Sequence, residues 1–306
     1  MGSFAERITA KVRQFGPLVV GLDPHFDFLP PFLLRRFMPQ GVSFEGLAEA
    51  VLAFGAELLE ALSGEVGCIK IQLAFYEALG VPGMWALSET LRLAKDRDFL
   101  VILDGKRNDI ASSATLYAQG YLSGIRIGDA ILPSFWSVDA LTVNPYLGED
   151  GLRPFFVEAY QNGKGVFVLA RTSNPSAPFL QDEGRSERVF EKVASLVDTL
   201  RREFAEDSPI SSFGIVAGAT YPEDLKRLRE RFPSLLFLVP GIGAQGGSIE
   251  VVRFAFLPGG LGALVNVSRD ILFAYRKGGR EEGEDFAERA LERAREYRKI
   301  LESIIP

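Results

Sequence analysis

The chain has 306 residues and a formal net charge of −6 at pH 7, an acidic balance that argues against the basic surface typical of nucleic-acid-binding proteins. The single cysteine, Cys68, and the single histidine, His25, exclude an intrachain disulfide and metal centres built from several cysteines or imidazoles. Because no apolar run reaches the roughly 18 residues of a membrane span and the N-terminus lacks an apolar signal segment, we expect a cytoplasmic protein without a membrane or nucleic-acid partner.

Short apolar runs and helical patterns alternate along the chain. The helical patterns, with apolar residues three and four apart, cover residues 3–15, 44–62, 85–95, 111–120, 152–159, 187–204, 222–231 and 281–304. The apolar runs predict strands over residues 18–22, 68–72, 100–103, 140–144, 165–170, 213–217, 235–239 and 262–267. Thr220 is placed to cap the helix that begins near Pro222.

This alternation indicates a parallel sheet with helices on both faces. Eight strands favour closure into a (β/α)₈ TIM barrel that occupies residues 1–306 as a single domain, with an open doubly wound sheet as the alternative. Residues 25–42 are rich in proline and phenylalanine and too irregular for one long helix. We expect them to form an inserted loop after the first strand, with a helical turn near residues 32–37.

Charged residues follow the third expected strand as soon as its apolar run ends. Asp104 and Lys106 are two residues apart and therefore share one face of the strand, and Asp109 follows in the turn. Lys70 interrupts the second strand, where an ammonium group is costly unless a carboxylate meets it. The sequence therefore predicts a charge network of Lys70, Asp104, Lys106 and Asp109, although a surface ion pair at a strand end is the simpler alternative.

Polar side chains also follow the other strands, at the end where a barrel binds its ligands. Those expected at the mouth are Asp23, Lys70, Asp104, Lys106, Ser173, Gln245 and Arg269. The glycine-rich residues 241–247 after strand seven and Arg269 after strand eight match the usual phosphate site of such barrels, with a plain turn as the alternative for the glycines.

The network suggests a reaction class. A lysine that is held charged beside a substrate carbon can deliver a proton to it, and no metal cluster or histidine base is needed. Lyase chemistry through a carbanion fits this arrangement, with no cofactor.

The string from Asp104 to Ile110, Asp-Gly-Lys-Arg-Asn-Asp-Ile, resembles the D-x-K-x-x-D-I signature of the orotidine 5'-phosphate decarboxylase family. The resemblance extends over nearly the whole chain. Further strings in the expected order are residues 21–25, Lys70, residues 240–247 and residues 268–269. The insertion after Asp23 and residues 144–146 and 218–220 resemble the longer bacterial branch of that family.

The resemblance implies decarboxylation of orotidine 5'-monophosphate to UMP, the last step of de novo pyrimidine nucleotide synthesis, without metal or cofactor. It implies that Lys106 protonates C6 of the pyrimidine and that Asp104 faces the substrate carboxylate. Asp23 and Lys70 would bind ribose hydroxyls, and Lys70 would also belong to the charge network.

The resemblance also implies a homodimer with shared active sites, in which Asp109 comes from the partner subunit. Ser173 would read the pyrimidine edge, Gln245 would bridge base and phosphate, and Arg269 would bind phosphate. Ser113 stands where the family has threonine, with Thr115 nearby, so either hydroxyl could reach the partner's site.

Two other functions remain open at this point. A related sugar-phosphate lyase or aldolase shares the D-x-K-x-x-D string but uses magnesium and an acidic residue on strand two, where this chain has Lys70. A catalytically inactive phosphate-binding barrel could keep Gln245 and Arg269 but has no reason to keep four alternating charges.

Overall fold

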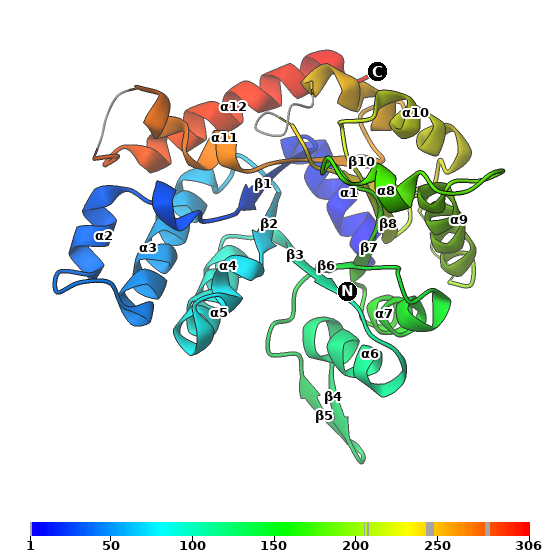
Figure 1. Ribbon diagram of the computed structural model, residues 1–306, viewed down its shortest axis with the longest axis horizontal. Helices are drawn as coiled ribbons and strands as arrows, with labels where there is room; N and C mark the ends of the chain where they lie inside the picture. Colours follow the sequence, from blue (N-terminus) through cyan, green and yellow to red (C-terminus); the bar gives the residue numbers. More distant parts are fainter. Residues whose placement is uncertain (1, 205, 207, 243–247, 279–281) are drawn as a thin grey trace.

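Eight parallel strands close into a barrel in the computed structural model, which describes residues 2–204, 206, 208–242, 248–278 and 282–306. The strand order around the barrel is β1-β10-β9-β8-β7-β6-β3-β2 (Figure 1). The strands are β1 (Leu18–Leu22), β2 (Cys68–Gln72), β3 (Leu100–Arg107), β6 (Ala140–Val143), β7 (Gly165–Arg171), β8 (Phe213–Ala217), β9 (Leu236–Val239) and β10 (Ala263–Val267). The predicted (β/α)₈ barrel is confirmed, and the open sheet is excluded.

Helices cover the outside of the barrel. The longer ones are α1 (Phe4–Phe15), α3 (Phe44–Leu62), α5 (Gly80–Asp96), α6 (Ala111–Ala118), α7 (Glu149–Gln161), α9 (Val189–Arg201), α10 (Pro222–Arg231) and α12 (Phe286–Ile304). In α12 the buried residues recur at spacings of three and four, as an amphipathic helix requires: Phe286, Ala290, Ala294, Tyr297 and Leu301. Within the described ranges, no helix combines the length and the apolar character needed to cross a lipid bilayer.

Helix α1 closes the N-terminal end of the barrel. Phe4 and Ile8 of this helix belong to the cluster of buried residues that fills the barrel interior. The ring of Phe4 meets that of Phe167 edge-on, with centroids 6.1 Å apart. A side chain at Gly165, where β7 begins, would collide with the Phe4 ring, so the close approach requires glycine. The opposite end, at the carboxyl ends of the strands, stays open for a ligand.

The segment after β1 is more ordered than the expected loop. It contains the 3₁₀ turn η1 (Phe26–Phe28) and the helix α2 (Pro31–Phe37), which lies at the predicted helical turn. Shorter helices also appear at α4 (Ala74–Glu77), α8 (Pro178–Gln181) and α11 (Arg269–Leu272), with 3₁₀ turns at η3 (Ile249–Ala255) and η4 (Ala274–Gly278).

The proposed cap of α10 is wrong. Tyr221 rather than Thr220 occupies the N-cap position, without a side-chain hydrogen bond, and the Thr220 hydroxyl is buried with no hydrogen-bond partner. Pro222 at the start of the helix fixes a helical φ and has no N–H group to satisfy, so the first turn forms without a side-chain cap.

A two-stranded antiparallel hairpin was not expected from the sequence. It consists of β4 (Gly124–Ile127) and β5 (Ala130–Pro133), joined by Gly128 and Asp129. Figure 1 shows it projecting away from the barrel below α6. Isoleucines on both sides of a two-residue turn that contains glycine indicate a hairpin. The alternation of parallel strands and helices expected for a barrel contains no such hairpin, so these strands were not predicted.

Asp270 attaches α11, which begins with Arg269, to the C-terminal helix. Its Oδ2 atom accepts hydrogen bonds from Arg293 Nη2 at 2.6 Å and from the Tyr297 hydroxyl at 2.7 Å, and Lys277 also pairs with it. Burial alone raises the pKa of the Asp270 carboxyl, but these three partners outweigh it and lower the pKa to about 2.

We expect Asp270→Asn to lower the free energy of unfolding by about 1 to 2 kcal/mol near neutral pH, because charge-assisted bonds are lost. A carboxyl whose pKa is depressed by folding stabilises above its unfolded pKa of about 3.9, and this contribution is lost as pH falls toward the folded pKa. The difference from wild type, measured by urea denaturation, should therefore be smaller near pH 3 than near pH 7.

Asp96→Asn is the matched control, because Asp96 pairs with Arg92 on an exposed face of α5. It should change stability by less than about 1 kcal/mol. An Asp270→Asn deficit that is equally small, or that is the same at both pH values, would contradict the anchoring role.

Candidate functional site

A cavity of about 500 Å³ opens at the carboxyl ends of the barrel strands. This is the end where parallel barrels bind their ligands, because the loops that follow the strands converge there. Its polar lining includes Asp23, Lys70, Gln72, Asp104, Lys106, Thr142, Ser173, Asn266 and Arg269. Its apolar lining includes Leu169, Val216, Leu238 and Ile242.

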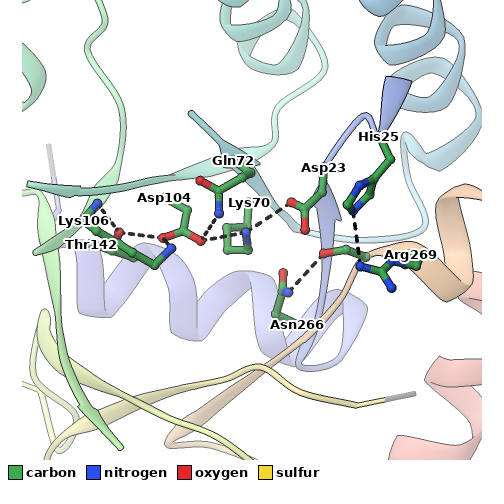
Figure 2. A network of polar contacts seen from close by, with 10 residues as sticks. Asp23, His25, Lys70, Gln72, Asp104, Lys106, Thr142, Asn266 and Arg269 are labelled. Carbon is green, nitrogen blue, oxygen red and sulfur yellow. Dashed lines mark hydrogen bonds and ion pairs between the residues drawn. The ribbon is translucent and has the colours of Figure 1, made fainter. Parts of the chain in front are cut away.

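The carboxylate of Asp104 is the centre of the polar network in this cavity (Figure 2). Its Oδ1 atom accepts from Lys106 Nζ at 2.7 Å and from Thr142 Oγ1 at 2.8 Å. Its Oδ2 atom accepts from Lys70 Nζ at 3.1 Å and from Gln72 Nε2 at 2.8 Å. Donors from β2, β3 and β6 therefore fix both oxygens of one buried carboxylate.

A distortion of β3 brings Lys106 to Asp104. The pairing of β3 with β6 shifts register between Leu103 and Arg107. Within this bulge Lys106 has a backbone φ of +46°, in the left-handed region that costs a non-glycine residue about 1 to 3 kcal/mol. The Lys106 N–H donates to Thr142 Oγ1 at 3.0 Å, which helps to hold this conformation. Backbone strain of this kind is typical of functional sites.

Lys70 lies between two carboxylates inside the barrel. Its side chain is only 5% exposed, and its ammonium group is 3.1 Å from Asp104 Oδ2 and 3.4 Å from Asp23 Oδ1. Removing an ammonium group from water costs several kcal/mol, and one ion pair at 3 Å returns about 5 kcal/mol at an effective dielectric of 20. Two carboxylates therefore make the burial of this charge tolerable.

The pKa values of the network follow from the same balance. Burial lowers the pKa of the Lys70 ammonium, but Asp104 and Asp23 outweigh burial and raise it above the ordinary lysine value. Burial raises the pKa of the Asp104 carboxyl, but Lys70 and Lys106 outweigh it and hold that pKa well below its usual range. Both groups are therefore charged near neutral pH.

The other end of the cavity is positive. Arg269 at the start of α11 lines it, and Nη2 of its guanidinium is 3.5 Å from Nε2 of His25. Asn266 on β10 is buried beside it and donates to Ser268 Oγ at 3.3 Å. A side chain at Gly21 would collide with the Ser268 hydroxyl, so glycine on β1 makes room for this end of the site.

The structure brings most of the predicted site residues together. Asp23, Lys70, Asp104, Lys106, Ser173 and Arg269 all line the cavity. Gln245 lies outside the described residues. Together the charged side chains of this lining amount to three cations and two carboxylates, so the described part of the cavity suits an anionic ligand.

Asp109 and Ser113 do not line the cavity of their own barrel. The Asp109 carboxylate accepts a hydrogen bond from the N–H of Ile110 at 2.8 Å, and Ser113 is exposed on α6. Thr115 donates to the Ala111 carbonyl one turn earlier in the same helix, at 3.1 Å. Within one chain, none of these three residues therefore lines the cavity.

The sequence analysis missed Gln72, Thr142 and Asn266. Each lies two residues from another inward-facing position on its strand, so the two-residue period of a strand predicts the direction of these side chains. The two-residue period does not reveal which residue each side chain bonds to. The hydrogen bond from Thr142 to Asp104, for example, joins β6 to β3 at the point where the register between these strands shifts.

Residues 16–279 of the chain match the orotidine 5'-phosphate decarboxylase / HUMPS family. An orotidine 5'-phosphate decarboxylase of Rhodopirellula baltica is 42% identical over 281 residues, which cover 90% of this chain and 90% of that protein. A protein of the same name from Clostridium perfringens is 35% identical over 303 residues, covering 98% of this chain and 99% of that protein. The solved structure of Leishmania donovani OMP decarboxylase is similar with a TM-score of 0.70 and 30% identity, covering 97% of this chain and 99% of that one.

We expect Asp104→Asn to destabilise the fold by about 3 kcal/mol, because Lys70 then keeps a buried charge with only Asp23 to compensate it. Without the Asp104 charge, burial lowers the folded pKa of Lys70 below its unfolded value of about 10.4. The unfolded state then binds more protons, so the variant gains stability relative to wild type as pH rises. Urea denaturation should show a deficit that shrinks between about pH 7 and pH 10.

Thr142→Val is the control, since it removes a neutral donor from the same carboxylate. It should cost about 1 kcal/mol with no such change between these pH values. An Asp104→Asn deficit that stays constant over the range would show that the buried charge of Lys70 is not its source.

Proposed function

The chain belongs to the orotidine 5'-phosphate decarboxylase / HUMPS family, and from this premise we propose that it converts orotidine 5'-monophosphate to uridine 5'-monophosphate. The reaction is that of a carboxy-lyase and completes de novo pyrimidine nucleotide synthesis, for which we propose a cytoplasmic location. The observation that carries this proposal is the fixed carboxylate of Asp104 between two ammonium groups, in a cavity whose other end holds Arg269.

The nucleotide is oriented by the two unlike ends of the cavity. Its phosphate group binds Arg269, and its pyrimidine lies at the Lys106 end, where Ser173 reads the ring edge. Asp23 and Lys70 lie between these ends and bind the ribose hydroxyls (Figure 2). Gln245, outside the described residues, retains the predicted role of bridging base and phosphate.

Decarboxylation breaks the bond between C6 and the carboxylate carbon, and its electron pair stays on C6 as CO₂ leaves. That pair lies in the plane of the ring, where the π system cannot delocalise it, so charge must stabilise it. The Lys106 ammonium supplies that charge and then gives a proton to C6, forming UMP. The Lys106 side chain is 46% exposed and is not enclosed as Lys70 is.

Asp104 contributes through its fixed position. Two carboxylates 4 Å apart repel by about 4 kcal/mol at an effective dielectric of 20, so a substrate carboxylate beside Asp104 is less stable than in water. Four hydrogen bonds prevent Asp104 from turning away. Enzymes lower barriers by up to about 23 kcal/mol, and binding of the distant phosphate supplies part of this by holding the site together.

The test is the loss of orotate absorbance when the nucleotide is incubated with the protein and EDTA. Wild type should remove the chromophore, whereas Lys106→Ala should abolish the reaction and still bind nucleotide, because no other described side chain is as well placed to protonate C6. A metal-dependent sugar-phosphate lyase or an inactive phosphate-binding barrel would leave the chromophore intact.

Lys299→Ala is the matched control, since Lys299 is exposed on α12 and is not among the residues that line the cavity. It should keep wild-type activity. Near-normal turnover by Lys106→Ala would remove Lys106 from the mechanism.

We also propose that the active form is a homodimer in which Asp109 completes the partner's site. Exposed apolar side chains, which are concentrated in the segment that follows Asp109, support this. They lie on α6, the β4–β5 hairpin and the loops nearby, and they are Ile110, Leu116, Tyr117, Ile125, Ile127, Ile131, Leu132, Phe135, Tyr146 and Leu147. In the proposed dimer a second copy covers these side chains and places its own Asp109, with Ser113 or Thr115, at the neighbouring cavity.

Two inactive variants should then rescue each other. Equal amounts of Lys106→Ala and Asp109→Ala chains give about half heterodimers after random exchange, each with one intact site and one doubly altered site. About a quarter of wild-type decarboxylation should return. Mixtures that stay inactive after subunit exchange has been demonstrated, for example by mass spectrometry, would show that Asp109 acts within its own chain.

A further inference from the structure

His25 lies at the positive end of the cavity, where the proposed reaction gives it no role. It is the only histidine of the chain, and its imidazole lines the cavity with Nε2 at 3.5 Å from Nη2 of Arg269. Figure 2 shows the pair at the end of the network opposite Lys106. The two residues are 244 positions apart in sequence, so the fold alone brings them together.

The imidazole is held in place by backbone bonds and by aromatic rings. The His25 N–H donates to the Asp23 carbonyl at 2.8 Å, and the His25 carbonyl accepts from the Phe28 N–H at 2.9 Å. The rings of Phe75, Phe28 and Phe273 surround the imidazole, with centroid distances of 4.8, 5.6 and 6.2 Å. A ring packed on three sides keeps its free edge directed at Arg269.

Few charged groups face this imidazole. Burial lowers the pKa of His25, and Arg269 lowers it further, whereas Asp23 and Asp27 act in the opposite direction without reversing the shift. In the free protein the imidazole is therefore neutral at pH 7, and Nε2 can accept from the Arg269 guanidinium.

Other charged groups of the adjoining elements have partners elsewhere. Asp270 of α11 pairs with Lys277 of η4 and with Arg293. Arg276 of η4 lies over the Phe28 ring and donates to the Asp27 carbonyl at 3.4 Å. Glu77 of α4 pairs with Arg107.

We propose that His25 is a second phosphate-binding side chain, which takes up a proton from solvent when the phosphate group of the nucleotide binds Arg269. The inference rests on the proposed function, which places that phosphate at Arg269. An anion in contact with the guanidinium lies within reach of an imidazole 3.5 Å away. Its negative charge favours the imidazolium, which then donates a charge-assisted hydrogen bond to a phosphate oxygen.

Proton uptake gives phosphate affinity a definite dependence on pH. Binding raises the pKa of His25, so the contribution of His25 is fully present below the free-state pKa and is lost as pH rises through the bound-state pKa. Each unit by which binding raises the pKa corresponds to about tenfold tighter binding by the protonated form. The phosphate group itself gains negative charge as pH rises through the same range, because its second pKa is about 6. The pH dependence of wild type must therefore be compared with that of a variant without the imidazole.

The single histidine makes a direct measurement possible. In proton NMR of the untagged protein, the imidazole Cε1–H resonance is followed between about pH 5 and pH 8 in the free protein, with UMP, and with uridine, which lacks the phosphate group. We expect UMP to raise the His25 pKa by about one unit or more and uridine to leave it unchanged.

Two variants separate charge from packing. His25→Phe keeps an aromatic ring against Phe75, and His25→Gln keeps a neutral hydrogen-bonding group. Relative to wild type, both should raise KM for orotidine 5'-monophosphate more near pH 6 than near pH 8, with little change in kcat, because Lys106 is untouched. At about pH 8, His25→Gln should be closer to wild type than His25→Phe, since it can still accept from Arg269.

The outcomes distinguish this inference from the proposed function. A wild type that decarboxylates the substrate and binds UMP, but whose His25 pKa does not move, overturns the role of His25 and leaves the reaction intact. A wild type that does neither overturns the proposed function. In that case titration with inorganic phosphate decides the inference alone, and an unmoved His25 pKa overturns it.

Discussion

The burial of the Asp104 carboxylate is the constraint on which the rest of the site depends. A carboxylate removed from water must be met by donors on both oxygens, and here Lys70, Gln72, Lys106 and Thr142 provide them. The requirement explains features that look unrelated when taken one at a time. A lysine interrupts an apolar strand, a threonine faces the barrel interior, and strand β3 is bulged with Lys106 in a left-handed conformation.

The closed barrel makes this arrangement possible. Because the strands are parallel and their pairing is fixed, inward-facing residues of β2, β3 and β6 meet at one level, above the apolar side chains that α1 seals at the other end. The polar side chains at this open end of the barrel form two groups. Paired lysines and Asp104 lie on the side of β2 and β3, whereas Arg269 and His25 lie on the side of β1 and α11. A ligand with one anionic end is thereby given a single orientation.

The proposed reaction uses these two sides differently. The Lys70–Asp104–Lys106 group is complete within one chain and has its charges fixed before a ligand enters, which is the condition for electrostatic stabilisation of a carbanion without reorganisation. The proposed phosphate side is built from residues that follow β1 and β10, where burial and Arg269 lower the pKa of His25. Binding and chemistry are therefore assigned to separate groups, and phosphate binding can hold the site together at a distance from C6.

The sequence by itself determined the barrel strands to within a few residues, because buried strands are apolar runs and their ends are marked by charge. It also determined that Lys70 needs a carboxylate, because an ammonium group inside an apolar strand is costly to bury. The two-residue period of a strand showed that Asp104 and Lys106 share a face. Only the tertiary structure decided the bulge at Lys106, the Thr142 bond, the contact of His25 with Arg269 and the β4–β5 hairpin. Period and propensity act over a few residues, whereas strand register and barrel closure join residues from opposite ends of the chain, such as Leu18 of β1 and Val265 of β10.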